Sequence, residues 1–285
     1  MRIKSSVSEK RREKTVSTVQ RPVIGLVGLG HMGSVMARHF IAADWEVVGW
    51  DRDPDAIERF SASGGTAAES IAEVAVAPVV ISIVFDDDST REVAFGTNGL
   101  IEALPPGGIH VVMASISPAL AQELDIAHSA QGSQLLAASV FGRPEAAETS
   151  DLLINCSGPA SAYAEVEPLL SLLGTSRWIG DEPAQAMLVK TMGNSLIQTT
   201  VEMLREMFQF LKAGGIDEQL AKEVLVDTLF PGPIYTGYAQ HYIADPSSAA
   251  MIDMARKDRR NCLEAAEEMG VNLPVIRFLS ENDLP

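Results

Sequence analysis

Short apolar runs alternate with longer mixed segments through the first two thirds of the chain. Six runs have the length of a buried strand: Val23–Gly28, Glu46–Asp51, Val79–Val84, Ile109–Met113, Leu135–Ala138 and Leu152–Cys156. The segments between them have helical patterns, and two of these begin with the helix-start pairs Asp53-Pro54 and Ser117-Pro118. Strands that alternate with helices predict βαβ units and an α/β fold with a doubly wound, mostly parallel sheet.

The pattern changes after Trp178. Residues 183–213 form one long helical pattern whose only internal breaker is Gly193, and the remaining chain is helical in character apart from the loop at residues 230–233. We therefore predict a sheet domain over residues 22–180 and an all-helical domain over residues 181–285. Residues 1–21 are polar and basic without an apolar core. We expect a disordered extension there, with a targeting or regulatory tail as the alternative.

A glycine motif follows the first predicted strand. Gly28, Gly30 and Gly33 form G-x-G-x-x-G at the opening of a helix. Such glycines allow a tight turn, close approach of a pyrophosphate to the backbone, and close packing of helix on sheet. We expect a dinucleotide to contact this loop and the end of the third strand, at Gly28, Leu29, Gly30, His31, Met32, Gly33, Val84 and Phe85.

The end of the second strand bears on which dinucleotide is bound. Asp51 lies 21 positions after Gly30, where an acidic residue accepts hydrogen bonds from the adenosine ribose of NAD. Arg52 follows directly and could pair with the 2′-phosphate of NADP, or face solvent. Because a carboxylate repels a phosphate, the pair slightly favours NAD over NADP.

Composition excludes several function classes. With 22 Lys+Arg against 38 Asp+Glu, the 285 residues carry a formal charge of −16, which disfavours nucleic acid and anionic membranes as partners. No apolar run reaches the length of a transmembrane helix. The two cysteines fit a reducing, cytoplasmic setting and form no zinc motif. We interpret Asp86–Asp88 as a solvated loop and helix cap, and expect no metal site.

Five ordered blocks resemble the β-hydroxyacid dehydrogenases, which include 3-hydroxyisobutyrate dehydrogenase, tartronate semialdehyde reductase and glyoxylate/succinic semialdehyde reductase. The blocks are IGLVGLGHMGSVMA at 24–37, WDRDPDAI at 50–57, ASISP at 114–118, KTMGN at 190–194 and the pair Lys257-Asp258. The likeness covers about residues 22–279. It implies a Rossmann domain like the NAD-binding domain of 6-phosphogluconate dehydrogenase, a small hydroxyacid or aldehyde substrate, and a homodimer or homotetramer formed through the helical domain.

The same resemblance assigns Lys190 and Asn194 to catalysis. Reduction of a carbonyl by hydride needs a proton donor at the oxygen. Lys190 follows the apolar stretch 186–189, whose desolvation would lower the pKa of the ammonium toward working pH. Asn194 lies four residues on, on the same helix face, where it could orient that ammonium or bind a substrate hydroxyl. Spacing alone would favour a surface lysine and a capping asparagine.

The resemblance also assigns Ser115, Ser117, Lys257 and Asp258 to the substrate side of the site. The chain departs from the family in two places. Ala114 replaces the leading serine of the family's serine–threonine–isoleucine–serine–proline motif. The segment ASVFGR at 138–143 replaces a proline–valine–serine–glycine–glycine run whose amides hold the substrate carboxylate.

That second segment retains Gly142 and adds Phe141 and Arg143. Arg143 could clamp a carboxylate or face solvent, and Phe141 would make the pocket more apolar. The run VFGRPEAA somewhat resembles imine reductases, although those usually carry Asp or Tyr where Lys190 stands.

Three functions therefore stay open. The first is an NAD(P)-dependent dehydrogenase or reductase acting on CH–OH groups, the second an imine reductase, and the third a non-catalytic NAD(P)-binding protein. The retained Lys190 and Asn194 favour the first.

Overall fold

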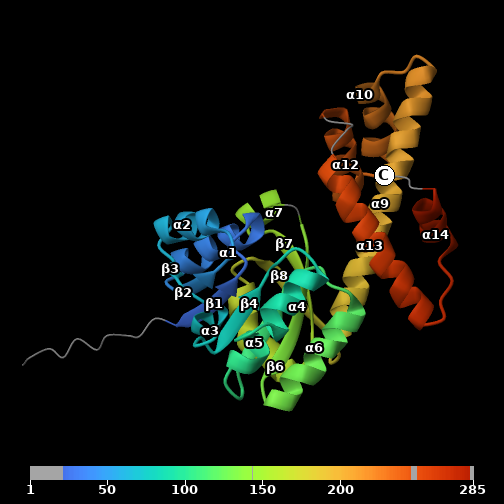
Figure 1. Cartoon of the computed structure of the whole chain (residues 1–285). Helices are drawn as coiled ribbons and strands as arrows, with labels where there is room; N and C mark the ends of the chain where they lie inside the picture. The colour runs from blue at the N-terminus through green and yellow to red at the C-terminus, as the bar shows by residue number, and fades with distance from the viewer. Residues whose placement is uncertain (1–21, 143, 245–248, 283–285) are drawn as a thin grey trace, which may run out of the picture.

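The computed structural model describes residues 22–142, 144–244 and 249–282. It has an eight-stranded sheet flanked by helices, from which a long helix leads into a helical region (Figure 1). The predicted fold class is confirmed. The expected basic extension at residues 1–21 and the candidate Arg143 lie outside the described residues.

The sheet has the order β3-β2-β1-β4-β5-β6-β7-β8. Its strands are β1 Val23–Val27, β2 Glu46–Trp50, β3 Thr66–Ala67, β4 Val79–Ser82, β5 Ile109–Val112, β6 Gln134–Phe141, β7 Leu152–Ser157 and β8 Gly174–Gly180. All neighbours are parallel except β6 and β7, which are antiparallel. The strand order reverses between β1 and β4, and ligands of such sheets bind in the crevice at that point.

Helices cover both faces of the sheet. They are α1 His31–Ala42, α2 Pro54–Ala62, α3 Ile71–Val74, α4 Asp87–Phe95, α5 Leu100–Ala103, α6 Pro118–Gln131, α7 Pro144–Glu148 and α8 Ala160–Leu170. The two helix starts predicted from sequence are confirmed: the side chains of Asp53 and Ser117 cap α2 and α6 by accepting backbone N–H groups, and proline occupies the first turn of each.

The predicted long helix is confirmed as α9 (Pro183–Ala213). Beyond it lie α10 Glu218–Ala221, a π-helical turn Lys222–Val226, α11 Asp227–Leu229, α12 Pro233–Ala244, α13 Ala249–Glu268 and α14 Pro274–Glu281. Helices α12 and α13 pack on α9 (Figure 1). No helix within the described part of the chain combines the length and apolar character needed to cross a membrane.

The sheet differs from the sequence prediction at three strands. Strand β6 does not end at Ala138 but runs on to Phe141, because its last residues pair with β7, Val140 opposite Ile154 and Phe141 opposite Leu153. Strand β8 was missed because its side chains alternate between half-buried and exposed and give no apolar run. The short edge strand β3 was missed for the same reason, since both its residues are exposed.

Two histidines lie fully buried in the sheet domain. The Ser82 hydroxyl lies 2.8 Å from His110 Nε2, His110 Nδ1 lies 2.9 Å from His128 Nε2, and His128 Nδ1 lies 2.8 Å from Ser133 Oγ. Ser133 in turn donates to the His128 carbonyl. With one proton on each imidazole, every ring nitrogen and both serine hydroxyls in this hydrogen-bonded series have a partner. Both imidazoles are therefore neutral. Burial lowers the pKa of His110 well below its ordinary value and that of His128 to about 4.

Both cysteines are buried and form no disulfide. Cys156 lies in β7, where burial raises the pKa of its thiol to about 12. Cys262 lies in α13, which packs against α9.

Candidate active site

A cleft of about 1920 Å³ opens between the carboxyl ends of the strands and helices α9 and α12. Most of the residues expected from sequence line it: Gly28, Gly30, His31, Met32, Gly33, Asp51, Arg52, Val84, Phe85, Ser115, Gly142, Lys190, Asn194, Lys257 and Asp258. The structure thus brings the glycine loop, the end of β4 and the lysine helix to one cavity.

The glycine loop has the geometry of a dinucleotide cradle. Gly28 has φ of +98°, and a Cβ there would lie 2.3 Å from the Ile83 carbonyl oxygen. A Cβ on Gly33 would lie 1.9 Å from the Gly28 oxygen. A Cβ on Gly30, in contrast, would meet nothing within 4 Å and would occupy the open space at the start of α1. The first turn of α1 carries no acidic residue, so its N–H groups and helix dipole favour an anion.

Asp51 is held in place by backbone amides. Its Oδ2 accepts a 2.6 Å hydrogen bond from Leu29 N–H and its Oδ1 a 2.9 Å bond from Asp53 N–H. The Leu29 side chain itself is buried in the core, so Leu29 acts at the cleft only through its backbone. Arg52 is exposed at the rim of the same groove.

Lys190 reaches the sheet from α9. Its Nζ donates a 2.7 Å hydrogen bond to the carbonyl oxygen of Val140, in the part of β6 that the sequence did not predict. The ammonium also lies 4.6 Å from the ring centroid of Phe141. The pKa of Lys190 is lowered to about 8, mainly by burial; the nearby Asp258 carboxylate raises this pKa and the Lys257 ammonium lowers it. Both protonation states are therefore populated near neutral pH.

Phe141 and Gly193 fit together beside this lysine. A Cβ on Gly193 would lie 2.3 Å from Phe141 Cζ, so the ring packs directly on the helix where the side chain is missing. The breaker inside the long helical pattern therefore makes room for an aromatic residue of the opposite wall. Phe141 itself lines the cleft.

A polar chain connects the three elements around Lys190. Asn194 Nδ2 donates to Asp258 Oδ2 at 2.7 Å, Asp258 Oδ1 lies 3.6 Å from Lys257 Nζ, and Lys257 Nζ donates to the Ser115 carbonyl at 3.2 Å. The Lys257 ammonium also lies 5.7 Å from the ring centroid of Phe85. These polar contacts join α9, α13 and the loop after β5, and they are one of the connections between the sheet domain and the helical region.

Ser117 has a different place from the one expected. Its hydroxyl donates to Asp87 Oδ2 at 2.5 Å and accepts the Leu120 N–H as the cap of α6. It is not among the residues that line the cleft. Helix capping thus accounts for this serine. Asp86 caps α4 in the same way, and the described residues contain no group of three or more histidine, cysteine or acidic side chains that could hold a metal.

Sequence reasoning missed the far part of the cleft. Gln198 and Arg205 of α9 and His241 of α12 line it, and so do Tyr235 and Tyr238 of α12. On α9 these residues continue the helical face of Lys190 and Asn194, at positions 190, 194, 198 and 205. That periodicity was the available signal.

Comparisons with known proteins give a consistent result. Residues 23–180 match the family model described as the NAD binding domain of 6-phosphogluconate dehydrogenase. The uncharacterised oxidoreductase YfjR of Bacillus subtilis is 34% identical over 88% of this chain and 89% of its own. L-Threonate dehydrogenase of Cupriavidus necator is 27% identical over 88% of this chain and 86% of its own.

The fold itself has been solved before. A crystal structure of 3-hydroxyisobutyrate dehydrogenase from Salmonella typhimurium superposes with a TM-score of 0.81, covering 92% of this chain and 93% of that one at 24% identity. This likeness is one of fold.

Proposed function

Because the chain belongs to the β-hydroxyacid dehydrogenase family, we propose that it transfers hydride between a nicotinamide dinucleotide and a small hydroxyacid or its aldehyde, with Lys190 as general acid and base. The observation that carries this proposal is the Lys190 ammonium, half-buried in the cleft and hydrogen-bonded to the Val140 carbonyl, with a pKa of about 8. A proton donor poised near working pH is what carbonyl reduction requires.

The cofactor groove fits a dinucleotide. The N–H groups at the start of α1 and the space above Gly30 would hold the pyrophosphate, and Asp51 would accept the ribose hydroxyls. The bound nicotinamide supplies or accepts the hydride. We propose NAD as the preferred form, because Asp51 is locked in the groove by two amides while Arg52 is exposed at its rim.

Lys190 can act without losing its anchor. An ammonium has three N–H donors, and one of them is used by the Val140 carbonyl. Another would then donate to the substrate oxygen and deliver its proton as negative charge develops there. In the direction of oxidation, the neutral amine accepts the hydroxyl proton. The Phe141 ring shields the group from water on one side.

The substrate would lie between Lys190 and the loops that follow β5 and β6. Ser115, the Gly142 backbone and the Lys257 ammonium line this space and supply donors for a carboxylate. Asn194 holds Asp258, whose charge tunes Lys190. Arg143 adjoins Gly142 in sequence, and its role stays a prediction.

The helical region supports assembly of more than one copy. Leu196, Met203 and Phe210 of α9 are more than 60% exposed, and such apolar surface is usually covered by a partner. We propose a homodimer or homotetramer formed through this region, which light scattering on the purified protein would test.

The test of function is steady-state oxidation of NADH and of NADPH with glyoxylate, tartronate semialdehyde, succinic semialdehyde and a cyclic imine. Lys190→Met is measured beside the parent, with nucleotide affinity as the check that the variant folds. We expect turnover of a carbonyl acid, and a loss of about 10²- to 10⁴-fold in kcat in Lys190→Met at unchanged nucleotide affinity.

Other outcomes separate the alternatives. Turnover of the imine that is indifferent to Lys190→Met would favour an imine reductase. Nucleotide binding with no turnover across the panel would favour a non-catalytic binding protein. Full carbonyl activity in Lys190→Met would overturn the assignment of the proton donor.

A further inference from the structure

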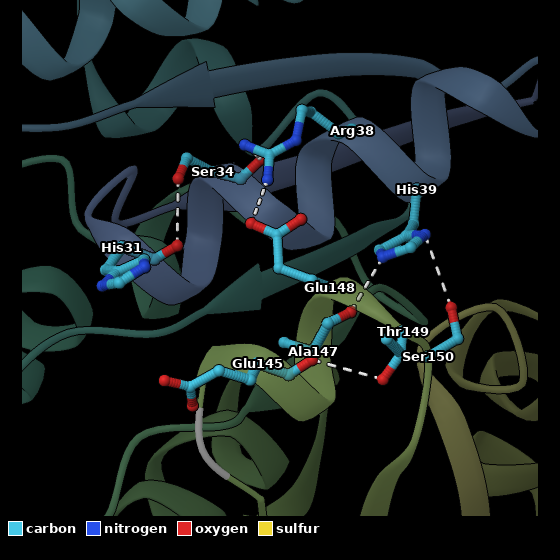
Figure 2. A network of polar contacts seen from close by, with 9 residues as sticks. All are labelled: His31, Ser34, Arg38, His39, Glu145, Ala147, Glu148, Thr149 and Ser150. Carbon is cyan, nitrogen blue, oxygen red and sulfur yellow. Dashed lines mark hydrogen bonds and ion pairs between the residues drawn. The ribbon is translucent and has the colours of Figure 1, made fainter.

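Helix α1 makes a second set of contacts at the end opposite its phosphate-facing turn. Arg38 Nη2 lies 2.5 Å from Glu148 Oε1 of α7. His39 Nε2 lies 2.8 Å from the Ala147 carbonyl oxygen, and His39 Nδ1 lies 3.4 Å from Ser150 Oγ. Figure 2 shows these groups meeting between the two helices. We call this set, Arg38, His39, Ala147, Glu148 and Ser150, the α1–α7 clamp.

Helix α7 depends on such contacts for its position. It has five residues, Pro144–Glu148, far fewer than an isolated helix needs. Ala147 is 1% exposed and packs into the core beneath α1. Ser150 has φ of +57° and also donates to the Leu172 carbonyl at 2.9 Å, which ties the end of the segment to the sheet domain. Helix α1 and these ties therefore determine where α7 lies.

The beginning of α7 lies at the active-site cleft. Gly142, Glu145 and Ala146 line the cleft, as do His31 and Met32 at the start of α1. Figure 2 shows His31 and Glu145 on the same side of the clamp. One helix thus positions the glycine loop with its first turn and the segment after β6 with its last turns.

From this geometry we infer that Arg38 and His39 are positioning residues, which fix the start of α7, where Glu145 and Ala146 face the substrate space, relative to the cofactor loop. The inference rests on the proposed function, because it assigns that segment to the carbonyl substrate. It predicts that nucleotide bound at the first turn of α1 orders α7 through the clamp. Neither residue lines the cleft, so both act through α7.

A purely structural ion pair would behave differently. Arg38 and Glu148 have 48% and 51% of their side chains exposed, and ion pairs of that exposure contribute little to stability. The pair Arg91–Glu123, with 43% and 46% exposed, also joins two helices but does not touch α7. It is the matched control.

The experiment compares Arg38→Met, Glu148→Gln and the charge swap Arg38→Glu with Glu148→Arg against Arg91→Met. For each we measure KM and kcat for the best carbonyl substrate, the Kd for nucleotide, and amide hydrogen exchange of residues 141–150 with and without nucleotide. We expect KM to rise about three- to tenfold in the single variants, with kcat within about twofold and an unchanged nucleotide Kd. The charge swap restores KM, and Arg91→Met leaves it unchanged.

Hydrogen exchange tests the clamp independently of turnover. In the parent, nucleotide should slow exchange in α7, and in Arg38→Met this protection should be lost. If the parent reduces no substrate in the panel, the proposed function fails while the exchange comparison still decides about the clamp. Equal protection in parent and Arg38→Met, or a KM increase equally large in Arg91→Met, would overturn the inference.

Discussion

At the residue scale, the chemistry depends on how the charge of Lys190 is balanced. Burial and Lys257 lower its pKa, and Asp258 raises it. The three charges come from two helices, and Asn194 fixes the carboxylate among them. Small changes in this group therefore move the pH at which Lys190 works without moving Lys190 itself.

The pH profile of reduction should report this balance. Since the protonated lysine is the acid, kcat/KM for carbonyl reduction should fall as the pH rises through about 8, and the reverse reaction should accelerate over the same range. Asp258→Asn removes the charge that raises the pKa of Lys190. In this variant kcat/KM should therefore begin to fall at a lower pH than in the parent. A break at the same pH in Asp258→Asn would contradict this assignment.

A second prediction at this scale concerns the packing of Phe141 on Gly193. Gly193→Ala places a methyl group where the Phe141 ring lies. We expect a loss of about 1–3 kcal/mol in the free energy of unfolding from overpacking, with reduced activity as the ring leaves Lys190. Adding Phe141→Leu to Gly193→Ala should recover most of the stability in urea titrations. Additive losses in the double variant would show that the two residues do not compete for space.

At the element scale, the buried histidines link β4, β5 and α6. Each imidazole is neutral in the folded chain and has a pKa below its ordinary 6.5. The unfolded chain therefore binds protons more readily, and stability is complete above about pH 6.5 and declines as the pH falls toward 4. The shift of His128 alone corresponds to about 3 kcal/mol at the acid end.

This decline can be isolated with His128→Gln, which cannot titrate. Urea unfolding of the parent and the variant at pH 7.5, 5.5 and 4.5 gives the slope of the free energy with pH. We expect the variant to be less stable at pH 7.5 but to lose less stability on acidification. Parallel slopes would show that His128 contributes nothing to the acid sensitivity.

Elements with local signals were the ones that the sequence could predict. The glycine loop, the caps Asp53 and Ser117, and the long helix α9 are specified by neighbouring residues. The extension of β6 to Phe141 depends on a distant antiparallel partner, β7. The local sequence pattern therefore could not predict this extension. It also could not predict the hydrogen bond that the Val140 carbonyl accepts from Lys190.

The site was predictable to a similar degree. Motif residues such as Gly30, Asp51 and Lys190 line the cleft as expected. Ser117 does not, because its hydroxyl is used twice within the fold, by α6 and by Asp87. A sequence motif cannot distinguish a serine that faces substrate from one that caps a helix. The clamp between α1 and α7 carries no motif at all.

At the scale of the whole molecule, α9 joins the two halves. Its first turns contact the sheet through Ser139, whose hydroxyl donates to the Ala186 carbonyl, and through Ser157, whose hydroxyl donates to the Pro183 carbonyl. It also packs on α12 and α13. The cleft lies along this junction, so any change in the angle between the halves changes the distance between cofactor and substrate groups.

The angle between the two halves can be followed with fluorescent labels, because both native thiols are buried and should not take up the label. The chain has only two cysteines, both inside the protein, and the Cys156 thiol stays protonated at neutral pH. We expect neither to react with a maleimide in the native state, which thiol titration before and after denaturation would check. Fluorophores attached to cysteines introduced at the exposed positions Ser63 and Gln209 would then report energy transfer across the cleft in an otherwise natural sequence.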